Sequence, residues 1–397
     1  MVQVQGSAPW SDLPPELLGL VFLRLPTRTD RAFFPAVCRA WCSAARQSRL
    51  PPPSPVPWLV LPNGKVTSLP RGETFRLPDD VRYHTSCGEW LVLTRDDDSS
   101  CFLMNPFTRA TMPLPSLSSY SYYEHPMEFG DGVYPGIDKQ DTWLHVKNGE
   151  EISILSLVVC STRLIAAIVA VTDFGAIALC RPGAAAWSVS ARVECRWLSH
   201  MVFFQGKLYA FDADHSDHFD LIGIDIVDEH DSDEPRVSRI ECFIQGAYSQ
   251  YQKHAIHMNY LLESHGSLLM VCRKLSHNRY EAGSSEFKVR KADLEQHLWV
   301  DVRTLGNDQA LFLGRGCSKA VRVSPYDLFG DCIFFLDDYT DWYWKKRTTS
   351  CGVYDMKDRK IYLPLPTVSW INTYDPATWV FWQGETDKLE TAGEDFS

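Results

Sequence analysis

The sequence lacks the patterns that mark most secreted proteins and most enzymes. None of its 12 cysteines stands in a C-x-x-C pair, and no secretory signal precedes them, so free thiols in a reducing compartment, the cytoplasm or the nucleus, are expected. The chain contains no G-x-S-x-G elbow, phosphate loop, G-x-G-x-x-G or H-E-x-x-H motif. It therefore predicts a protein that is not an enzyme and that has no cofactor, no metal and no catalytic residues.

Positive charge and long apolar runs are also scarce. Lys and Arg total 39 against 50 Asp and Glu, which leaves a net charge of -11 and disfavours binding to nucleic acid or anionic lipid. The longest apolar stretch, 152–180, is interrupted by Arg163 and Asp173, whereas a membrane-spanning helix needs about 20 unbroken apolar residues. The stretch instead predicts two buried strands, over 152–160 and 164–171. Neither nucleic acid nor a membrane is expected as a partner.

Residues 10–50 have a helical pattern. Ser11 and Asp12 supply a polar N-cap before Pro14 and Pro15, which suit the first turn of a helix. Apolar residues then recur at three- and four-residue spacing on both sides of Pro26 and Pro35. They are Leu17, Leu18, Val21, Phe22 and Leu25, and then Val37, Cys38, Trp41 and Ala45. The segment therefore predicts a unit of two or three helices.

This helical unit is small for its apolar content. At about 40 residues it is near the size below which a domain needs a metal, a disulfide or a partner, and it has no metal-ligand spacing. Its first helix carries more apolar surface than one short neighbour covers. We therefore expect the rest of the chain or another protein to cover that surface.

A proline-rich segment follows at 51–57, with five prolines in seven residues. Such a segment favours extended polyproline geometry and acts as a stiff spacer of about 3 Å per residue. The alternative is an irregular loop packed against the next domain.

From 58 to 385 short runs of β-forming residues alternate with turn residues, and one short helix is expected over 292–297. Gln205-Gly206 between two aromatic-rich runs predicts a hairpin. Segments 102–115 and 353–366 resemble each other, because in both a strand ends in Asn or Asp and a second strand closes with Leu-Pro. A recurring four-stranded unit predicts a β-propeller. The predicted fold class is an α+β multidomain chain, a small all-α unit followed by an all-β propeller of six or seven blades; a pair of β-sandwiches is the alternative.

An acidic segment is the most conspicuous charged feature. Residues 212–234 hold ten carboxylates and no Lys or Arg, which is typical of a solvated loop. One alternative is a cation site, which does not follow the EF-hand pattern, formed by Asp212, Asp214, Asp217 and Asp220 with His215 and His218. The other is a rim that attracts a basic target surface. That rim consists of Asp228, Glu229, Asp231 and Asp233.

Other motifs carry less weight. His254-x-x-His257 has ligand spacing without an accompanying carboxylate motif, so structural or surface histidines are expected. Gly314-Arg315-Gly316-Cys317 indicates a turn. The 13 Trp and 16 Tyr favour blade cores over a ligand-binding aromatic cage, and no spaced acid pair supports a glycan-processing propeller enzyme.

The helical segment resembles an F-box, the module that docks on a Skp-type adaptor in cullin-based ubiquitin ligases. The resemblance rests on Leu13-Pro14-Pro15-Glu16-Leu17-Leu18, on Leu23-Arg24-Leu25-Pro26, and on Val37-Cys38-Arg39-Ala40-Trp41. Cys42 departs from the usual pattern, in which a basic residue follows the Trp. Carried over from this resemblance, the expected adaptor contacts are Leu13, Pro14, Leu17, Leu18, Val21, Leu25, Val37, Cys38 and Trp41.

The remainder is similar to a plant family in which an F-box precedes a kelch-like propeller of unknown function. The resemblance rests on segments such as 57–62, 103–108, 261–269, 311–314 and 331–338. It implies a substrate-recognition subunit, in which the F-box binds a Skp-type adaptor and through it a cullin, and the propeller binds a target protein. The alternative is a propeller that binds and inhibits its target, for example a kinase, without ubiquitin transfer.

Overall fold

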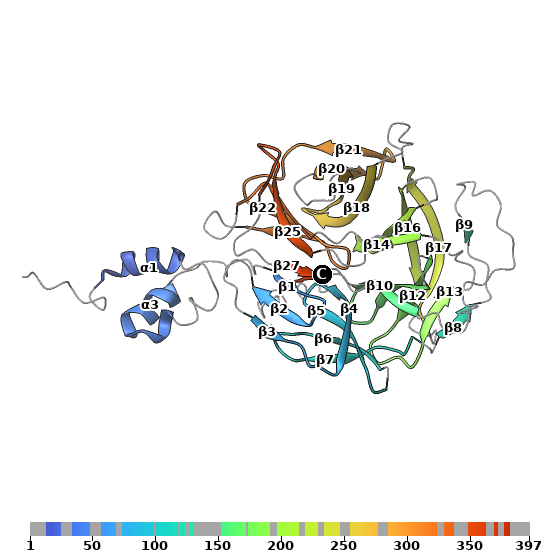
Figure 1. Cartoon of the computed structure of the whole chain (residues 1–397), viewed down its shortest axis with the longest axis horizontal. Helices are drawn as coiled ribbons and strands as arrows, with labels where there is room; N and C mark the ends of the chain where they lie inside the picture. The colour runs from blue at the N-terminus through green and yellow to red at the C-terminus, as the bar shows by residue number, and fades with distance from the viewer. Residues whose placement is uncertain are drawn as a thin grey trace, which may run out of the picture.

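The structure, a computed structural model, describes the helical unit and most of the β region (Figure 1). The described residues are 13–24, 34–47, 57–68, 74–98, 100–117, 120–123, 128–129, 152–171, 174–190, 197–213, 219–228, 234–246, 255–276, 285–323, 329–336, 348–362, 369–371 and 377–381. The proline-rich segment 51–56 lies outside them, so the choice between a stiff spacer and a packed loop stays open.

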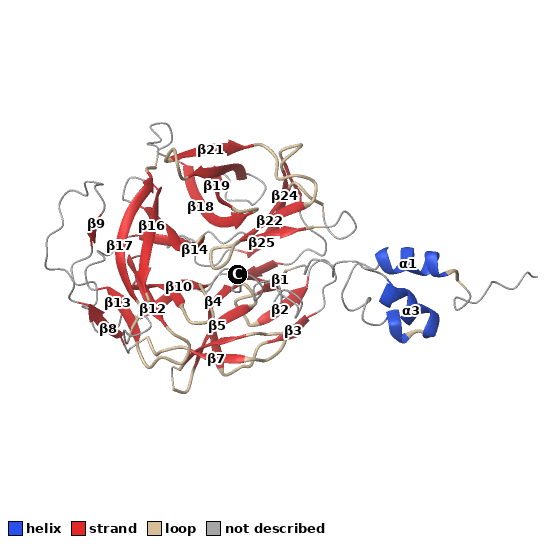
Figure 2. Ribbon diagram, turned by 180° about the vertical axis from the view of Figure 1, so that it is seen from behind, coloured by secondary structure: helices blue, strands red, loops and turns tan. Residues whose placement is uncertain are grey.

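The helical unit consists of α1 (Pro15–Arg24), the 3-10 turn η2 (Phe34–Ala36) and α3 (Arg39–Gln47). Helix α1 begins as expected, because the Pro14 carbonyl accepts hydrogen bonds from the backbone N–H groups of Leu17 and Leu18. The unit has a core of its own, formed by Leu18, Phe34 and Ala44. In Figure 2 the helices stand apart from the strands that make up the rest of the molecule.

The strands form six sheets arranged around a centre, so the protein is a six-bladed propeller and the sandwich alternative is wrong (Figure 1). Blade 1 contains β28 (Thr378–Val380), β1 (Trp58–Val60), β2 (Lys65–Ser68) and β3 (Thr74–Arg76); blade 2 contains β4 (Val81–Cys87), β5 (Trp90–Arg95), β6 (Cys101–Met104) and β7 (Thr111–Pro113). Blade 3 contains β10 (Ile152–Val159), β11 (Ile165–Val171), β12 (Phe174–Cys180) and β13 (Trp187–Ser190), and blade 4 contains β14 (Trp197–Phe204), β15 (Lys207–Ala213), β16 (Phe219–Val227) and β17 (Arg236–Ile244).

Blade 5 contains β18 (Ala255–Ser264), β19 (Ser267–Ser276), β20 (Ser285–Asp293) and β21 (Leu298–Val302). Blade 6 contains β23 (Lys319–Arg322), β22 (Gln309–Leu313), β24 (Cys332–Leu336), β25 (Thr348–Asp355) and β26 (Lys360–Tyr362), with β27 (Ser369–Ile371) paired to β25. The short strands β8 (Tyr120–Tyr123) and β9 (Glu128–Phe129) pair in parallel with the outer edges of blades 3 and 4.

The apolar stretch 152–180 lies in blade 3, where β10, β11 and β12 are antiparallel neighbours. Most of these side chains are buried between blades, which confirms the prediction of buried strands. No helix in the described part of the chain is long and apolar enough to cross a membrane.

The ring closes between the two ends of the β region. Strand β28, near the C-terminal end, pairs with β1, and Trp58 lies opposite Val380. The innermost strands of neighbouring blades lie beside one another around the centre. From blade 1 to blade 6 they are β28, β4, β10, β14, β18 and β23. Six apolar clusters fill the spaces between successive blades, so each blade is stabilised mainly by its two neighbours.

One hairpin turn recurs between the last two strands of blades 2, 5 and 6. It begins with an Asn or Asp whose side-chain oxygen accepts hydrogen bonds from backbone N–H groups two and three residues ahead. The residue four positions on has a positive φ of 54–62°. The three pairs are Asn105 with Arg109, Asp293 with His297, and Asp355 with Arg359. This shared turn explains why segments 102–115 and 353–366 resemble each other.

The prediction of a short helix over 292–297 is wrong. Ala292 and Asp293 end β20, and the next four residues form the recurring turn before β21. The segment ADLEQH contains good helix formers, but Asp293 accepts hydrogen bonds from the N–H groups of Glu295 and Gln296. Cross-strand pairing of Asp293 with Leu298 therefore overrides the local helix propensity. The hairpin expected at Gln205-Gly206 is present between β14 and β15.

Candidate partner-binding surfaces

The helical unit exposes large apolar side chains on the outside of a closed core. Leu17 is 46% exposed, Leu20 43% and Val37 58%. Leu17 and Leu20 are three residues apart on α1, so they lie on the same face of the helix. Because the unit already has its own core, these side chains are available to a partner.

The nine expected adaptor contacts divide between that surface and the core. Pro14, Leu17 and Val37 are exposed, and Cys38 is half-buried. Leu18 is fully buried, because it packs against Phe34 and Ala44 at the centre of the unit. Three of the nine are half-buried and pack against this core: Leu13, Val21 and Trp41. Leu25 lies outside the described residues.

Trp41 shares its ring surface with the core. Its ring centroid lies 4.4 Å from that of Phe34, and the Phe22 ring centroid lies 4.9 Å from that of Phe34. These aromatic contacts hold α1, η2 and α3 together. Trp41 therefore helps to position the exposed apolar side chains of the unit. The part of its ring that is not packed against the core is available to a partner.

Leu20 is not among the nine adaptor contacts expected from the sequence. The available signal was its spacing from Leu17, since residues i and i+3 of a helix share a face. The leucines of α1 are so frequent that spacing alone does not separate the buried face from the exposed one.

Of the four residues of the acidic rim, the structure describes Asp228 alone. Asp228 is half-buried and its Oδ1 accepts hydrogen bonds from Arg181, at 3.2 Å from Nε and 2.5 Å from the terminal nitrogen. This ion pair joins the loops that follow β12 and β16, in blades 3 and 4. Glu229, Asp231 and Asp233 lie outside the described residues, so target binding by this rim stays a prediction.

The described residues of the two candidate cation sites are Asp212, Asp220 and His257. Asp212 is buried, and Asp220 accepts a hydrogen bond from the Gly246 N–H at 2.7 Å. The other four candidate residues, Asp214, His215, Asp217 and His218, lie outside the described residues. His257 lies 3.6 Å from the Cys272 sulfur, whereas His254 falls outside the described residues. Among the described residues no group of three His, Cys, Asp or Glu side chains is arranged to hold a metal ion.

Buried cysteines carry protonated thiols. Burial raises the pKa of Cys87, Cys160 and Cys180 to about 12 and that of Cys101, Cys332 and Cys351 to about 11. A thiolate is the reactive form, so these six thiols are poor nucleophiles at neutral pH.

His200 lies inside the propeller, on strand β14. It occupies a β-bulge between Ser199 and Met201 with φ 46°, and its ring meets the ring of Tyr260 edge-on at 5.2 Å. Burial, with a smaller contribution from the charge of Arg315, lowers the pKa of His200 from 6.5 to about 4. The imidazole is therefore neutral in the folded protein at physiological pH.

Lowering the pH from about 7 to 4.5 is expected to destabilise the propeller through His200. Between pH 6.5 and 4 the unfolded chain binds a proton that the folded protein excludes, so this contribution is complete above pH 6.5 and is lost as the pH falls. The full pKa shift corresponds to about 3 kcal/mol, and because the residue is half-buried we expect about 2 kcal/mol. His200→Asn, which tolerates the positive φ, should remove this part of the pH dependence of the urea midpoint. The same pH dependence in both proteins would contradict the assignment.

Both parts of this chain match known families. The family described as KIB1-4 beta-propeller matches residues 66–355, and the F-box domain matches residues 10–52. An F-box/kelch-repeat protein from Arabidopsis thaliana is 35% identical over 127 residues, which are 29% of this chain and 35% of that protein. An F-box protein from the same plant is 32% identical over 120 residues, 28% of this chain and 29% of that protein. The chain thus spans about a third of the length of the curated relatives it matches.

F-box domains generally bind Skp-type adaptors of cullin complexes, which agrees with the exposed apolar side chains of the helical unit. The propeller match covers well over half of the chain, and the F-box match covers the helical unit. This chain therefore belongs to the KIB1-4 beta-propeller family and carries an F-box domain at its N-terminal end.

Proposed function

We propose that this protein is the substrate-recognition subunit of a Skp-cullin-F-box ubiquitin ligase. The observation that carries the proposal is the exposure of Leu17, Leu20 and Val37 on a helical unit whose described residues form an apolar core of their own. Exposed leucines on a short helix suit an apolar groove on an adaptor. The propeller then binds the target protein.

The separation of the two parts supports this division of labour. The apolar core of the helical unit contains side chains of residues 13–45 alone among those described, and the propeller closes on itself through β28 and β1. Each part can thus bind its own partner without unfolding the other. Tethering a target in this way raises its effective concentration near the ubiquitin-loaded enzyme.

The proposed role is not catalytic. A subunit that positions its target needs no nucleophile of its own, and the six strongly shifted cysteine thiols are protonated at neutral pH. We expect the complex to act in the cytoplasm or the nucleus, where free thiols persist.

Affinity capture of the full chain tests the proposal. The expected result is a complex that contains a Skp-type adaptor and a cullin in fixed ratio, and that transfers ubiquitin to a co-captured protein when the conjugating enzymes are added. Capture of a target without adaptor or cullin would favour the alternative, a propeller that inhibits its target. Failure to retain the adaptor under low-salt conditions would overturn the ligase assignment.

A further inference from the structure

The outer edge of blade 5 differs from the outer edges of the two blades before it. In blades 3 and 4 the last strands, β13 and β17, each pair in parallel with one further strand, β8 and β9 (Figure 2). In blade 5 the last strand, β21, pairs with β20 on one side, and on its other side no strand pairs with it among the described residues. The outer edges of this propeller therefore accept an added strand, and the described part of the chain provides none for β21.

The outermost strands of blades 1, 2 and 6 also pair with no further strand in the described part of the chain, but their sequences protect them. These strands, β3, β7 and β26, have three residues each. Each contains a residue that discourages pairing with another chain: Arg76 in β3, Pro113 in β7 and Lys360 in β26. Strand β21 has five residues and contains no Lys, Arg or Pro. It is therefore the least protected of these four described edges.

Strand β21 presents apolar side chains to solvent at alternate positions. Leu298 is 40% exposed and Val300 is 46% exposed. Residues two apart on a strand point to the same face of the sheet, so these two side chains form an apolar stripe along the edge. An edge strand also turns the backbone N–H and C=O groups of every second residue away from its partner strand. An added strand would pair with those groups and cover the stripe.

Positive charge lies directly behind this edge. Lys288, Arg290 and Lys291 are on β20, the strand that pairs with β21. Asp301 is the one charged residue of β21; its Oδ2 lies 3.2 Å from Lys288 Nζ, and its Oδ1 lies 3.2 Å from Arg290 Nε. The carboxylate of Asp293, at the end of β20, accepts the hydrogen bonds of the turn. The middle of the edge therefore has three cations and one carboxylate. In a chain of net charge -11, this local excess of positive charge favours an acidic partner.

We propose that β21 binds an extended segment of the target polypeptide as a fifth strand of blade 5, and that apolar residues alternate with Asp or Glu in this segment. The apolar side chains extend the stripe formed by Leu298 and Val300. The carboxylates point to the opposite face of the sheet, which carries Lys288 and Arg290, because Arg290 pairs with Asp301 of β21. Backbone hydrogen bonds supply affinity and the alternation supplies specificity. That the segment belongs to the target rests on the proposed function, whereas the binding of such a strand does not.

Binding of a probe peptide to the full chain tests the edge directly. The probe is a fluorescently labelled octapeptide in which valine alternates with glutamate, blocked at both ends, and its fluorescence anisotropy is measured. The wild-type chain should bind the probe until the signal saturates. The same peptide with all of its backbone nitrogens methylated should not bind, because it keeps the side chains but cannot donate hydrogen bonds to β21. A peptide with lysine in place of glutamate should also lose binding, because the cations of β20 repel it.

Two variants of the chain locate the binding of the probe. Val300→Glu should weaken it about tenfold or more, because the substitution interrupts the apolar stripe and adds a carboxylate that repels the probe. The matched control is Tyr362→Glu, at a side chain that is 49% exposed on the protected edge strand β26, and it should bind the probe as the wild type does. Equal binding by the wild type and Val300→Glu, or equal binding of the plain and methylated peptides, would overturn the site.

The outcomes separate this proposal from the proposed function. Val300→Glu should retain the Skp-type adaptor, because β21 lies in the propeller and not in the helical unit. A wild-type chain that binds the probe but retains no adaptor would overturn the ligase assignment alone, and one that retains the adaptor but does not bind the probe would overturn the edge site alone. If Val300→Glu captures the wild-type chain's target with undiminished yield, the target does not use this edge. A wild-type dimer in sedimentation velocity that Val300→Glu converts to a monomer would assign the edge to a second copy of the chain, against the proposal.

Discussion

The full chain carrying Leu17→Asp and Val37→Asp is expected to lose a purified Skp-type adaptor almost completely. These two side chains are 46% and 58% exposed, so the substitutions leave the helical core intact. In a complex they would place unpaired carboxylates in an apolar interface, at a cost of several kcal/mol. We expect the affinity to fall at least 100-fold, about 2.7 kcal/mol, as measured by calorimetry or co-purification.

Two controls make this result specific. Ala40→Asp introduces the same charge at an exposed position of α3 and should retain the adaptor. Leu18→Ala should lose it for another reason: Leu18 is fully buried, so its truncation costs about 2–5 kcal/mol of core packing and lowers the helical signal in circular dichroism. Full adaptor retention by the double Asp variant would show that the exposed leucine and valine are not the docking surface.

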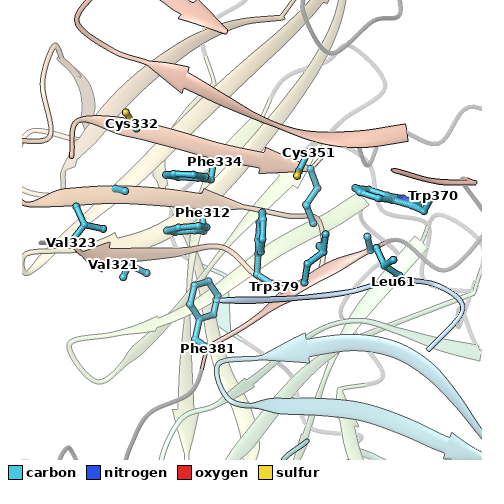
Figure 3. Close-up of a cluster of buried hydrophobic side chains, with 14 residues drawn as sticks. Leu61, Phe312, Val321, Val323, Cys332, Phe334, Cys351, Trp370, Trp379 and Phe381 are labelled. Atoms are coloured by element: carbon cyan, nitrogen blue, oxygen red, sulfur yellow. The ribbon is translucent and has the colours of Figure 1, made fainter. Parts of the chain in front are cut away.

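Trp379→Ala is expected to produce the largest loss of propeller stability among single substitutions. Trp379 is fully buried on the closing strand β28, and its Nε1 donates a hydrogen bond to the Leu313 carbonyl of blade 6 at 2.9 Å. Its ring meets Phe312 edge-on at 5.3 Å, within the cluster that Figure 3 shows between blades 6 and 1. Replacement of a buried tryptophan by alanine costs about 3–5 kcal/mol.

The urea midpoint of the propeller is the measurement for this prediction. Trp379→Phe keeps much of the packing but loses the hydrogen bond to Leu313, so it should cost less than the alanine variant. Tyr362→Ala, at a side chain that is 49% exposed on β26, should leave the midpoint nearly unchanged. A Trp379→Ala midpoint equal to that of Tyr362→Ala would show that the closing seam does not control propeller stability.

Local patterns predicted the element types well because neighbouring residues decide them. The N-cap before Pro14 and the leucine spacing predicted helix α1, and runs rich in Val and Ile predicted β10 and β11. The one predicted propeller helix, over 292–297, failed because a cross-strand pairing and an Asp293 turn outweigh helix propensity. Such pairing involves partners that a local window does not contain.

The binding surfaces were predicted less completely. The resemblance to an F-box indicated the right segment, but it placed the fully buried Leu18 beside the exposed Leu17 in one set and omitted Leu20. The Arg315 loop was expected to be a turn, and it is one. Its close approach to Thr85 and Thr378 depends on ring closure, since Thr378 lies more than 60 residues from Gly316 along the chain and Thr85 more than 200.

By itself, the sequence determined that a short leucine-rich helical segment precedes a long β region built from repeated units. The tertiary structure decided the number of blades, the pairing of β28 with β1, which leucines of α1 remain exposed, and where Arg315 lies. The physical reason is the range of the interactions. Helix capping, turns and alternation are set by residues within a few positions, whereas ring closure and burial depend on contacts between segments far apart in the chain.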